Sequence, residues 1–238
     1  MQFRSKNIVV LTGAGISAES GLKTFRDHDG LWEGHRVEEV ATPEAFAQNP
    51  ALVQKFYNER RVQLRSGEVE PNAAHRALAE FEAQHDADFT LVTQNVDDLH
   101  QRAGSNNVFP MHGELSKSRC TACEIVEDSA DYLDSDSMCR ACGAKGTLRP
   151  HIVWFGEIPL LMQEIELRIS SCDVFVSIGT SSVVYPAAGF SQLAKTFGAH
   201  CMELNKEPSA TATVFDEGVY GPATEVVPQF FLPEGEYQ

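Results

Sequence analysis

The stretch NIVVLTGAGISAESG, residues 7–21, places a short apolar run directly before a glycine-rich loop. Residues 7–12 (NIVVLT) have the length and composition of one buried strand. Gly13 and Gly15 follow at once, and the SAES sequence after them is compatible with a helix. A strand that runs through glycines into a helix is typical of a phosphate-binding loop, because backbone N–H groups can approach the anion closely.

The glycine loop alone is a weak indicator of nucleotide binding. Ala18 stands where the G-x-G-x-x-G loop of dehydrogenases has its third glycine. Glu38 and Glu39 do lie about 20 residues past the loop, where such enzymes carry an acidic residue. An NAD-dependent dehydrogenase is therefore an alternative that the glycine spacing disfavours.

Apolar segments alternate with helical patterns along the chain. Apolar runs predict further strands at 89–93, 174–178 and 200–204, and helical spacing predicts helices at 51–66, 72–84 and 96–103. This alternation predicts an α/β fold with a Rossmann-like parallel sheet and helices on both faces. The carboxyl ends of parallel strands meet at one edge of a sheet, so Gly13, Gln94-Asn95 and Gly179 should converge there.

Four cysteines interrupt this pattern with metal-ligand spacing. Two C-x2-C pairs enclose 15 residues, which is typical of a tetrahedral zinc site, whereas disulfides or a redox pair are disfavoured alternatives. Four thiolates leave no open position on the metal, so the zinc should be structural. Cys172 and Cys201 fall in or beside predicted strands and are expected to be core thiols. The expected zinc ligands are Cys120, Cys123, Cys139 and Cys142.

The cysteine-bearing segment also suggests how the chain is organised. We expect a catalytic domain of residues 1–112 and 149–238, interrupted by a small inserted zinc-binding module at 113–148. The module is acidic, and a zinc ribbon that grips nucleic acid would be expected to be basic. A non-enzymatic zinc-ribbon binding protein is a second alternative.

Composition excludes several classes of protein. The chain has 238 residues, an ordinary globular content of apolar and charged residues, and a net charge of −15. This charge argues against nucleic acid or an anionic membrane as the main partner. No apolar run approaches the roughly 18 residues of a transmembrane helix, and the first residues are polar. A cytoplasmic, soluble protein is expected.

Several longer motifs resemble the sirtuins, the NAD-dependent protein-lysine deacylases, in the family's order. The resemblance is to the bacterial desuccinylase branch, whose mark is a Tyr-x-x-Arg pair, here Tyr57 and Arg60, and whose first loop carries Thr24 where most sirtuins have Asp. Besides the four cysteines, the motifs are GAGISAESG (13–21), TFR (24–26), TQNVDDLH (93–100), MHGEL (111–115), RPHIVWFGE (149–157), GTSSVVYPAAG (179–189) and ELNKEPS (203–209).

The resemblance implies a set of NAD-binding residues. Asp97 would hold the nicotinamide carboxamide, Gln94 and Asn95 would order the ribose, and Phe25 would shield the reactive sugar carbon. From the residues alone, Asn95 or Asp97 could equally cap the helix expected from 96. The implied set is Gly13, Ala14, Gly15, Glu19, Thr24, Phe25, Arg26, Trp32, Gln94, Asn95, Asp97, Gly179, Thr180, Ser181, Asn205, Lys206, Glu207 and Ala223.

The resemblance also implies a catalytic base and an acyl pocket. His112 would be the general base on the ribose hydroxyls, a role that suits imidazole near neutral pH. A helical insertion around 36–70 would line the pocket, where Tyr57 and Arg60 would grip an acyl carboxylate; the alternative is a half-buried tyrosine beside a surface arginine. Strand-like residues 153–157 would pair with the substrate peptide, or else form an ordinary internal strand. Val153 and Phe155 would line the lysine tunnel.

The implied reaction consumes NAD as a co-substrate. The acyl group of a protein or peptide lysine moves to the ADP-ribose part of NAD, which gives free lysine, nicotinamide and O-acyl-ADP-ribose, without hydride transfer. Succinyl, malonyl and acetyl groups are the expected acyl groups. ADP-ribosyl transfer is an open side activity. The expected protein is a monomer with one structural zinc ion, acting on acyl-lysine proteins or peptides.

Overall fold

The main element of the fold is a six-stranded sheet in which every neighbouring pair is parallel. The computed structural model describes residues 3, 5–22, 34–129 and 132–232. Strand order is β3-β2-β1-β7-β8-β9, which is the order 3-2-1-4-5-6 of dinucleotide-binding sheets when only these strands are numbered. The strands are β1 Ile8–Thr12, β2 Phe89–Thr93, β3 Val108–Pro110, β7 Val174–Ile178, β8 His200–Asn205 and β9 Glu217–Tyr220.

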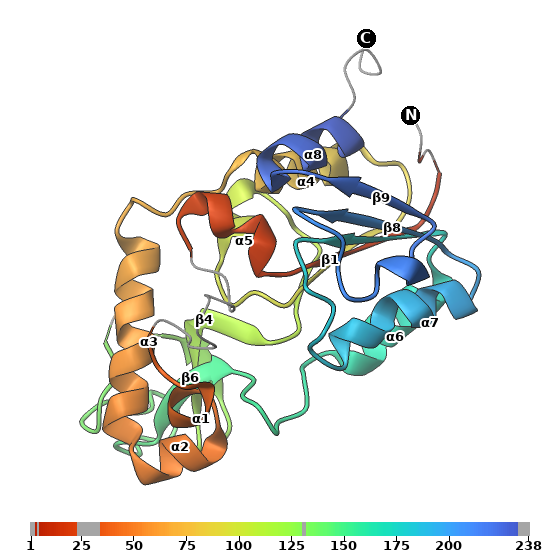
Figure 1. The fold of residues 1–238 in the computed structure, drawn as a ribbon. Helices are drawn as coiled ribbons and strands as arrows, with labels where there is room; N and C mark the ends of the chain where they lie inside the picture. The colour runs from red at the N-terminus through yellow and green to blue at the C-terminus, as the bar shows by residue number, and fades with distance from the viewer. Residues whose placement is uncertain (1–2, 4, 23–33, 130–131, 233–238) are drawn as a thin grey trace.

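Helices cover both faces of this sheet. Helices α4 (Ala73–Gln84) and α8 (Ala223–Phe231) lie side by side over one face, whereas α6 (Met162–Ser171) and α7 (Phe190–Thr196) cover the other (Figure 1). Successive residues of β1 point to opposite faces of the sheet and enter different cores. Val10 packs in the core beneath α4 and α8, and Val9 packs in the core beneath α6 and α7. Both faces are buried, which explains the continuous apolar runs of the strands and confirms the expected fold class.

A second lobe joins a small antiparallel sheet to three helices. The sheet has the order β5-β4-β6, from Val126–Asp128, Gly113–Cys120 and Leu148–Ile152. The helices are α1 Val37–Val40, α2 Pro43–Gln48 and α3 Pro50–Arg65. They share a core with Leu115 of β4 and Ile152 of β6. The division of the chain into 1–112 with 149–238 and 113–148 stays a prediction.

The predicted element boundaries differ from the structure mainly after the glycine loop. SAES does not form an α-helix; two 3₁₀ turns, Ala14–Ile16 and Ala18–Ser20, stand there instead. Gly15 donates its N–H to Gly179 O at 2.8 Å, which ties the chain just before SAES to the end of β7. The helix expected at 96–103 is the shorter α5, Leu99–Ala103. Further 3₁₀ turns stand at Ala187–Gly189 and Ala212–Val214.

No described helix is both long and apolar enough to cross a bilayer.

Three glycines bring the loops after β1 and β7 into backbone contact. A Cβ on Gly15 would lie 2.7 Å from Gly179 Cα, and one on Gly13 would lie 2.8 Å from Gly179 O. Gly179 itself has φ +61°, and its Cβ would meet Ile16 N at 2.5 Å. No larger residue fits at these positions without moving backbone. The contact lies between β1 and β7, where the strand order reverses and ligands bind in open α/β sheets.

This contact predicts that Gly15→Ala lowers the free energy of unfolding by about 1–3 kcal/mol, because the new methyl group must push two strand ends apart. Gly189→Ala is the matched control, because its Cβ would meet only Tyr185 Cε1, at 3.8 Å. Urea unfolding followed by circular dichroism measures both variants. Equal stability of the two variants would contradict the close-contact interpretation.

Candidate active site and metal centre

Polar side chains surround the glycine contact at the carboxyl ends of the strands. Gln94 Nε2 donates to Thr180 Oγ1 at 3.2 Å, and Asn205 Nδ2 donates to Thr180 O at 2.9 Å. Asn95 Nδ2 donates to Gly13 O at 3.2 Å. The expected convergence of Gly13, Gln94-Asn95 and Gly179 is therefore confirmed.

His112 is placed at the same edge by the chain leading into β4. Its Nδ1 lies 2.9 Å from Gln94 O. A carbonyl oxygen only accepts hydrogen bonds, so Nδ1 carries the proton and Nε2 has the free lone pair of a base. Burial lowers the pKa of His112 and outweighs the Gln94 hydrogen bond, which raises it. The imidazole is therefore neutral at physiological pH, as a general base requires.

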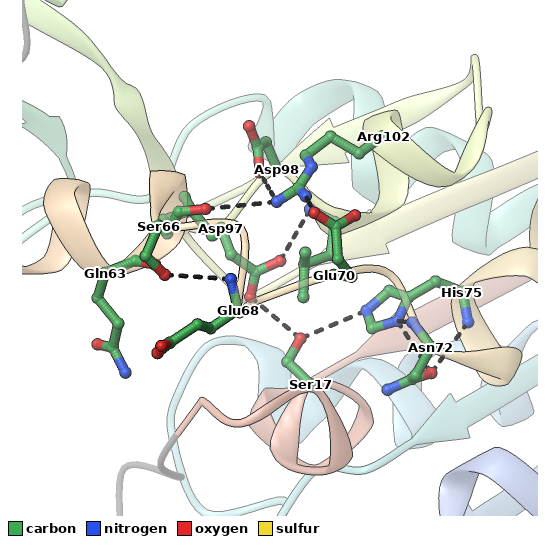
Figure 2. A network of polar contacts seen from close by, with 12 residues as sticks. Ser17, Gln63, Ser66, Glu68, Glu70, Asn72, His75, Asp97, Asp98 and Arg102 are labelled. Carbon is green, nitrogen blue, oxygen red and sulfur yellow. Dashed lines mark hydrogen bonds and ion pairs between the residues drawn. The ribbon is translucent and has the colours of Figure 1, made fainter.

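A buried network holds the Asp97 carboxylate (Figure 2). Ser17 Oγ donates to Asp97 Oδ2 at 3.1 Å and accepts from Asn95 Nδ2 at 3.1 Å. The second oxygen, Asp97 Oδ1, accepts the Leu99 N–H at 3.1 Å. Burial raises the pKa of Asp97 to about 6. Asp97 therefore binds the first N–H of α5 and also belongs to the cluster around the glycine loop, whereas its role toward nicotinamide stays a prediction.

Beneath the loop lie two buried histidines and Ser17, a residue that sequence reasoning missed. His75 Nε2 lies 3.4 Å from Ser17 Oγ, and His100 Nε2 lies 3.0 Å from Thr12 Oγ1. The two imidazole rings are 4.8 Å apart. Burial lowers the pKa of His75 to about 4 and that of His100 well below its ordinary value, so both are neutral. Ser17 lies within the glycine-loop motif, which was the available signal.

The other predicted NAD residues are placed unequally. Glu19 accepts from Thr224 N and Oγ1, at 2.9 and 3.0 Å, which ties the loop to the start of α8 beside Ala223. Lys206 and Glu207 are exposed beyond β8, and within the described ranges no side-chain hydrogen bond joins them to the loop. Ala14 and Ser181 are half-buried at the ends of β1 and β7. Thr24, Phe25, Arg26 and Trp32 lie outside the described residues.

Tyr57 and Arg60 lie one turn apart on α3. Tyr57 is almost fully buried, and its hydroxyl accepts from Trp154 Nε1 at 2.9 Å. Arg60 stacks its guanidinium 3.5 Å above the Phe56 ring and donates to Phe56 O at 2.7 Å. Burial raises the pKa of the Tyr57 phenol, an effect that the nearby Arg149 and Arg60 cations offset only in part. The phenol therefore stays neutral and able to donate.

Residues 153–157 contain a turn and form no paired strand, so the alternative of an ordinary internal strand is wrong, whereas pairing with a substrate peptide stays a prediction. Gly156 has φ +90°, and Glu157 donates its N–H to Trp154 O at 3.0 Å. The paired strand β6 ends earlier, at Ile152. The carboxylate of Glu157 explains the turn, because it accepts from the Trp154 N–H at 2.8 Å and from two Arg149 nitrogens at 2.7 and 2.9 Å.

The same turn places the two predicted tunnel residues. Val153 donates its N–H to His112 O at 2.9 Å, so it lies directly beside the histidine. Phe155 is 46% exposed and donates its N–H to Ala41 O at 3.0 Å. Val153 thus connects the turn to His112, and Phe155 connects it to the helical lobe.

The four predicted metal ligands come together in the small sheet's lobe. Their sulfur atoms all lie within 4.8 Å of one another, with Cys120–Cys142 at 3.8 Å and Cys123–Cys139 at 3.7 Å. Four thiolates at about 2.3 Å from a tetrahedral zinc ion would lie about 3.8 Å apart. None of the six cysteines is in a disulfide. Donor set and spacing therefore fit one zinc ion with no open position.

Helix α3 is also bonded to the cysteine-bearing segment. Gln54 Nε2 donates to Leu148 O at 2.6 Å. Asn58 makes two bonds to Leu133, with Nδ2 donating to its carbonyl at 2.8 Å and Oδ1 accepting its N–H at 3.0 Å. Arg61, 1% exposed, donates to Leu115 O at 3.0 Å. One helix therefore carries both Tyr57-Arg60 and the bonds to this segment.

Comparison with known proteins identifies close relatives over nearly the whole chain. A model of the Sir2 family matches residues 13–186. A Vibrio vulnificus protein named NAD-dependent protein deacylase is 56% identical over 230 residues, 96% of this chain and 94% of the relative. A Pasteurella multocida protein of the same name is 58% identical over 223 residues, covering 94% and 95%.

Solved structures agree with this comparison. A Sir2 homolog–NAD complex has TM-score 0.84 at 40% identity and covers 94% of this chain and 87% of its own. Sir2Af2 bound to a myristoylated histone peptide has TM-score 0.73 at 34% identity, covering 95% and 90%.

The metal centre predicts one zinc ion per chain, lost in Cys139→Ala because three thiolates no longer close the tetrahedron. Elemental analysis by mass spectrometry gives the zinc content, and a thermal scan should show a lower melting temperature for this variant. Cys172→Ala is the control, because Cys172 lies in the core away from the cluster and should leave the zinc content unchanged. Equal zinc in both variants would contradict the assignment.

The Gln94 contact predicts that neutral His112 carries its proton on Nδ1. Burial predicts that His112 titrates below its ordinary pKa near 6.5. Long-range ¹H–¹⁵N correlation spectra across pH distinguish the two ring nitrogens, and His112→Ala assigns the resonance. A proton on Nε2, or a titration above 6.5, would be inconsistent with this site.

Proposed function

The chain belongs to the Sir2 family and is an NAD-dependent protein deacylase, and from this premise we propose that it removes succinyl and malonyl groups, as well as acetyl groups, from lysine side chains. The observation that carries the acyl preference is the Tyr57-Arg60 pair on α3, joined through Trp154 to the turn beside His112. Products are free lysine, nicotinamide and O-acyl-ADP-ribose.

The pair suits a carboxylate at the end of an acyl chain. A guanidinium offers a planar fork of donors that matches a carboxylate, and a neutral phenol adds one O–H donor. Arg60 is only 14% exposed, so its charge is poorly screened by water. Arg60 Nη1 also lies 3.5 Å from Glu59 Oε2, but the Glu59 side chain is mostly exposed, so this pair is weak. A cation in such a place favours an anionic acyl group over a neutral one.

His112 is the proposed general base. Its Nδ1–H is held by Gln94 O, so Nε2 can take a proton from a ribose hydroxyl while the acyl group transfers. NAD supplies the ribose that accepts the acyl group and the nicotinamide that leaves. Val153 is bonded to the His112 carbonyl and would place the lysine chain against the base. Phe155 would line the tunnel beside it.

The glycine contact and its rim are the proposed NAD-binding surface. Gly13, Gly15 and Gly179 pack backbone against backbone, and the Gln94 and Asn95 amides are held at the same edge. A pyrophosphate would lie against this exposed backbone, because no side chain of these glycines covers it. Asp97, fixed through both carboxylate oxygens, would receive the nicotinamide carboxamide. Thr24, Phe25, Arg26 and Trp32 complete this surface as a prediction from the resemblance.

The thiols support a proposal for the metal and for the compartment. The closed four-thiolate set assigns zinc a structural role. Six cysteines without a disulfide support a reducing, cytoplasmic location. The net charge supports acyl-lysine proteins rather than nucleic acid as partners. A monomeric state stays a prediction from sequence.

The carboxylate clamp predicts that Arg60→Met lowers kcat/KM for a succinyl-lysine peptide by about 30-fold or more, as expected when a charged hydrogen-bond partner is lost. Activity on the matching acetyl-lysine peptide should change less than about threefold. Nicotinamide release on both peptides is the measurement.

Lys55→Met is the control for Arg60→Met, because Lys55 is an exposed cation on the same helix that pairs only with Glu59 among described residues. It should leave the succinyl-to-acetyl ratio of kcat/KM unchanged. An equal loss on both peptides in Arg60→Met would overturn the clamp.

A further inference from the structure

Trp154 makes a side-chain hydrogen bond to the Tyr57 phenol. Its Nε1–H donates to Tyr57 Oη at 2.9 Å, and both side chains are at most 2% exposed. An indole N–H only donates, so the phenol oxygen is the acceptor and its own O–H points away from the indole. The indole thus fixes the direction in which Tyr57 can donate.

The indole is itself held on two sides. The Arg149 guanidinium lies 3.5 Å from the centroid of the Trp154 ring, and Phe46 packs against the same ring with centroids 5.4 Å apart. Arg149 is fixed by its two bonds to Glu157 and by donation to Ile152 O at 2.9 Å. Trp154 therefore has little freedom to turn its N–H elsewhere.

The backbone around Trp154 is also held by hydrogen bonds. Its N–H donates to Glu157 Oε2 at 2.8 Å, and the preceding residue, Val153, donates to His112 O. The indole position is therefore tied to the position of the catalytic histidine. A packing role alone would need neither the aligned N–H nor the stacked cation.

We propose that Trp154 is a positioning residue for acyl specificity: its indole N–H aims the Tyr57 O–H at the carboxylate of the acyl chain. The inference rests on the proposed clamp by Tyr57 and Arg60. Arg149, stacked on the indole, polarises its N–H, and hydrogen bonds in such a chain strengthen one another. Acidic acyl groups gain from this chain of donors, whereas acetyl, which has no carboxylate, does not.

The test is Trp154→Phe, which keeps an aromatic ring beneath Arg149 and removes the N–H. We expect KM for the succinyl-lysine peptide to rise about three- to tenfold, the range for loss of one hydrogen bond, with kcat changed less than about twofold. KM for the acetyl-lysine peptide should change less than about twofold. Circular dichroism and zinc content confirm that the variant is folded.

Phe46→Leu is the matched control for packing. It disturbs the packing of Phe46 against the Trp154 ring without removing the N–H. It should therefore change KM for the two peptides equally. If Trp154→Phe also changes both peptides equally, Trp154 supports only the fold and the inference is overturned.

A double-mutant cycle with Tyr57→Phe separates this inference from the clamp itself. Tyr57→Phe/Trp154→Phe should lower the succinyl-to-acetyl ratio no further than Tyr57→Phe alone, because the indole acts through the phenol. Additive losses would overturn the inference while leaving the clamp intact. If the succinyl-to-acetyl ratio of kcat/KM is unchanged in both Tyr57→Phe and Arg60→Met, the clamp itself is contradicted.

Discussion

The active site depends on the contact between two backbone segments that only glycine permits. Gly13 and Gly15 after β1 lie against Gly179 after β7, closer than any Cβ would allow. Because this contact closes the point where the strand order reverses, it sets the distance between the two halves of the sheet. Gln94, at the end of β2, then bridges both: it donates to Thr180 and accepts from His112. His112, the proposed base, is thus positioned by the sheet itself.

The sequence was sufficient for features that local pattern determines. Strands such as 89–93 and 174–178 are continuous apolar runs because both sheet faces are covered, and they were placed without error. The cysteine pairs were equally clear, because metal geometry limits ligand spacing. Likewise, the motif around His112 pointed to the correct sheet edge. These predictions depended on near neighbours in the chain or on one dominant constraint.

The errors arose where distant partners decide the structure. The sequence SAES is compatible with a helix, but distant partners hold it in another conformation. Ser17 Oγ donates to Asp97, and the Gly15 N–H donates to Gly179 O. Residues 153–157 read as a strand, but Glu157 folds them back by accepting from the Trp154 N–H and from Arg149. No local sequence pattern identifies a carboxylate that will stabilise a turn by accepting its hydrogen bonds. The Trp154–Tyr57 bond spans 97 residues and was invisible for the same reason.

Helix α3 has a consequence for how the enzyme would lose function. The helix carries Tyr57 and Arg60, the proposed clamp for the acyl carboxylate. Gln54, Asn58 and Arg61 bond the same helix to the segment around the cysteines. The nucleotide side is built on the parallel sheet and has its own cores. Oxidation of the thiolates would therefore weaken the discrimination between acidic and neutral acyl groups before it prevents NAD binding. A structural ion in the second lobe would then make substrate selectivity, more than turnover, depend on the redox state of its four thiolates.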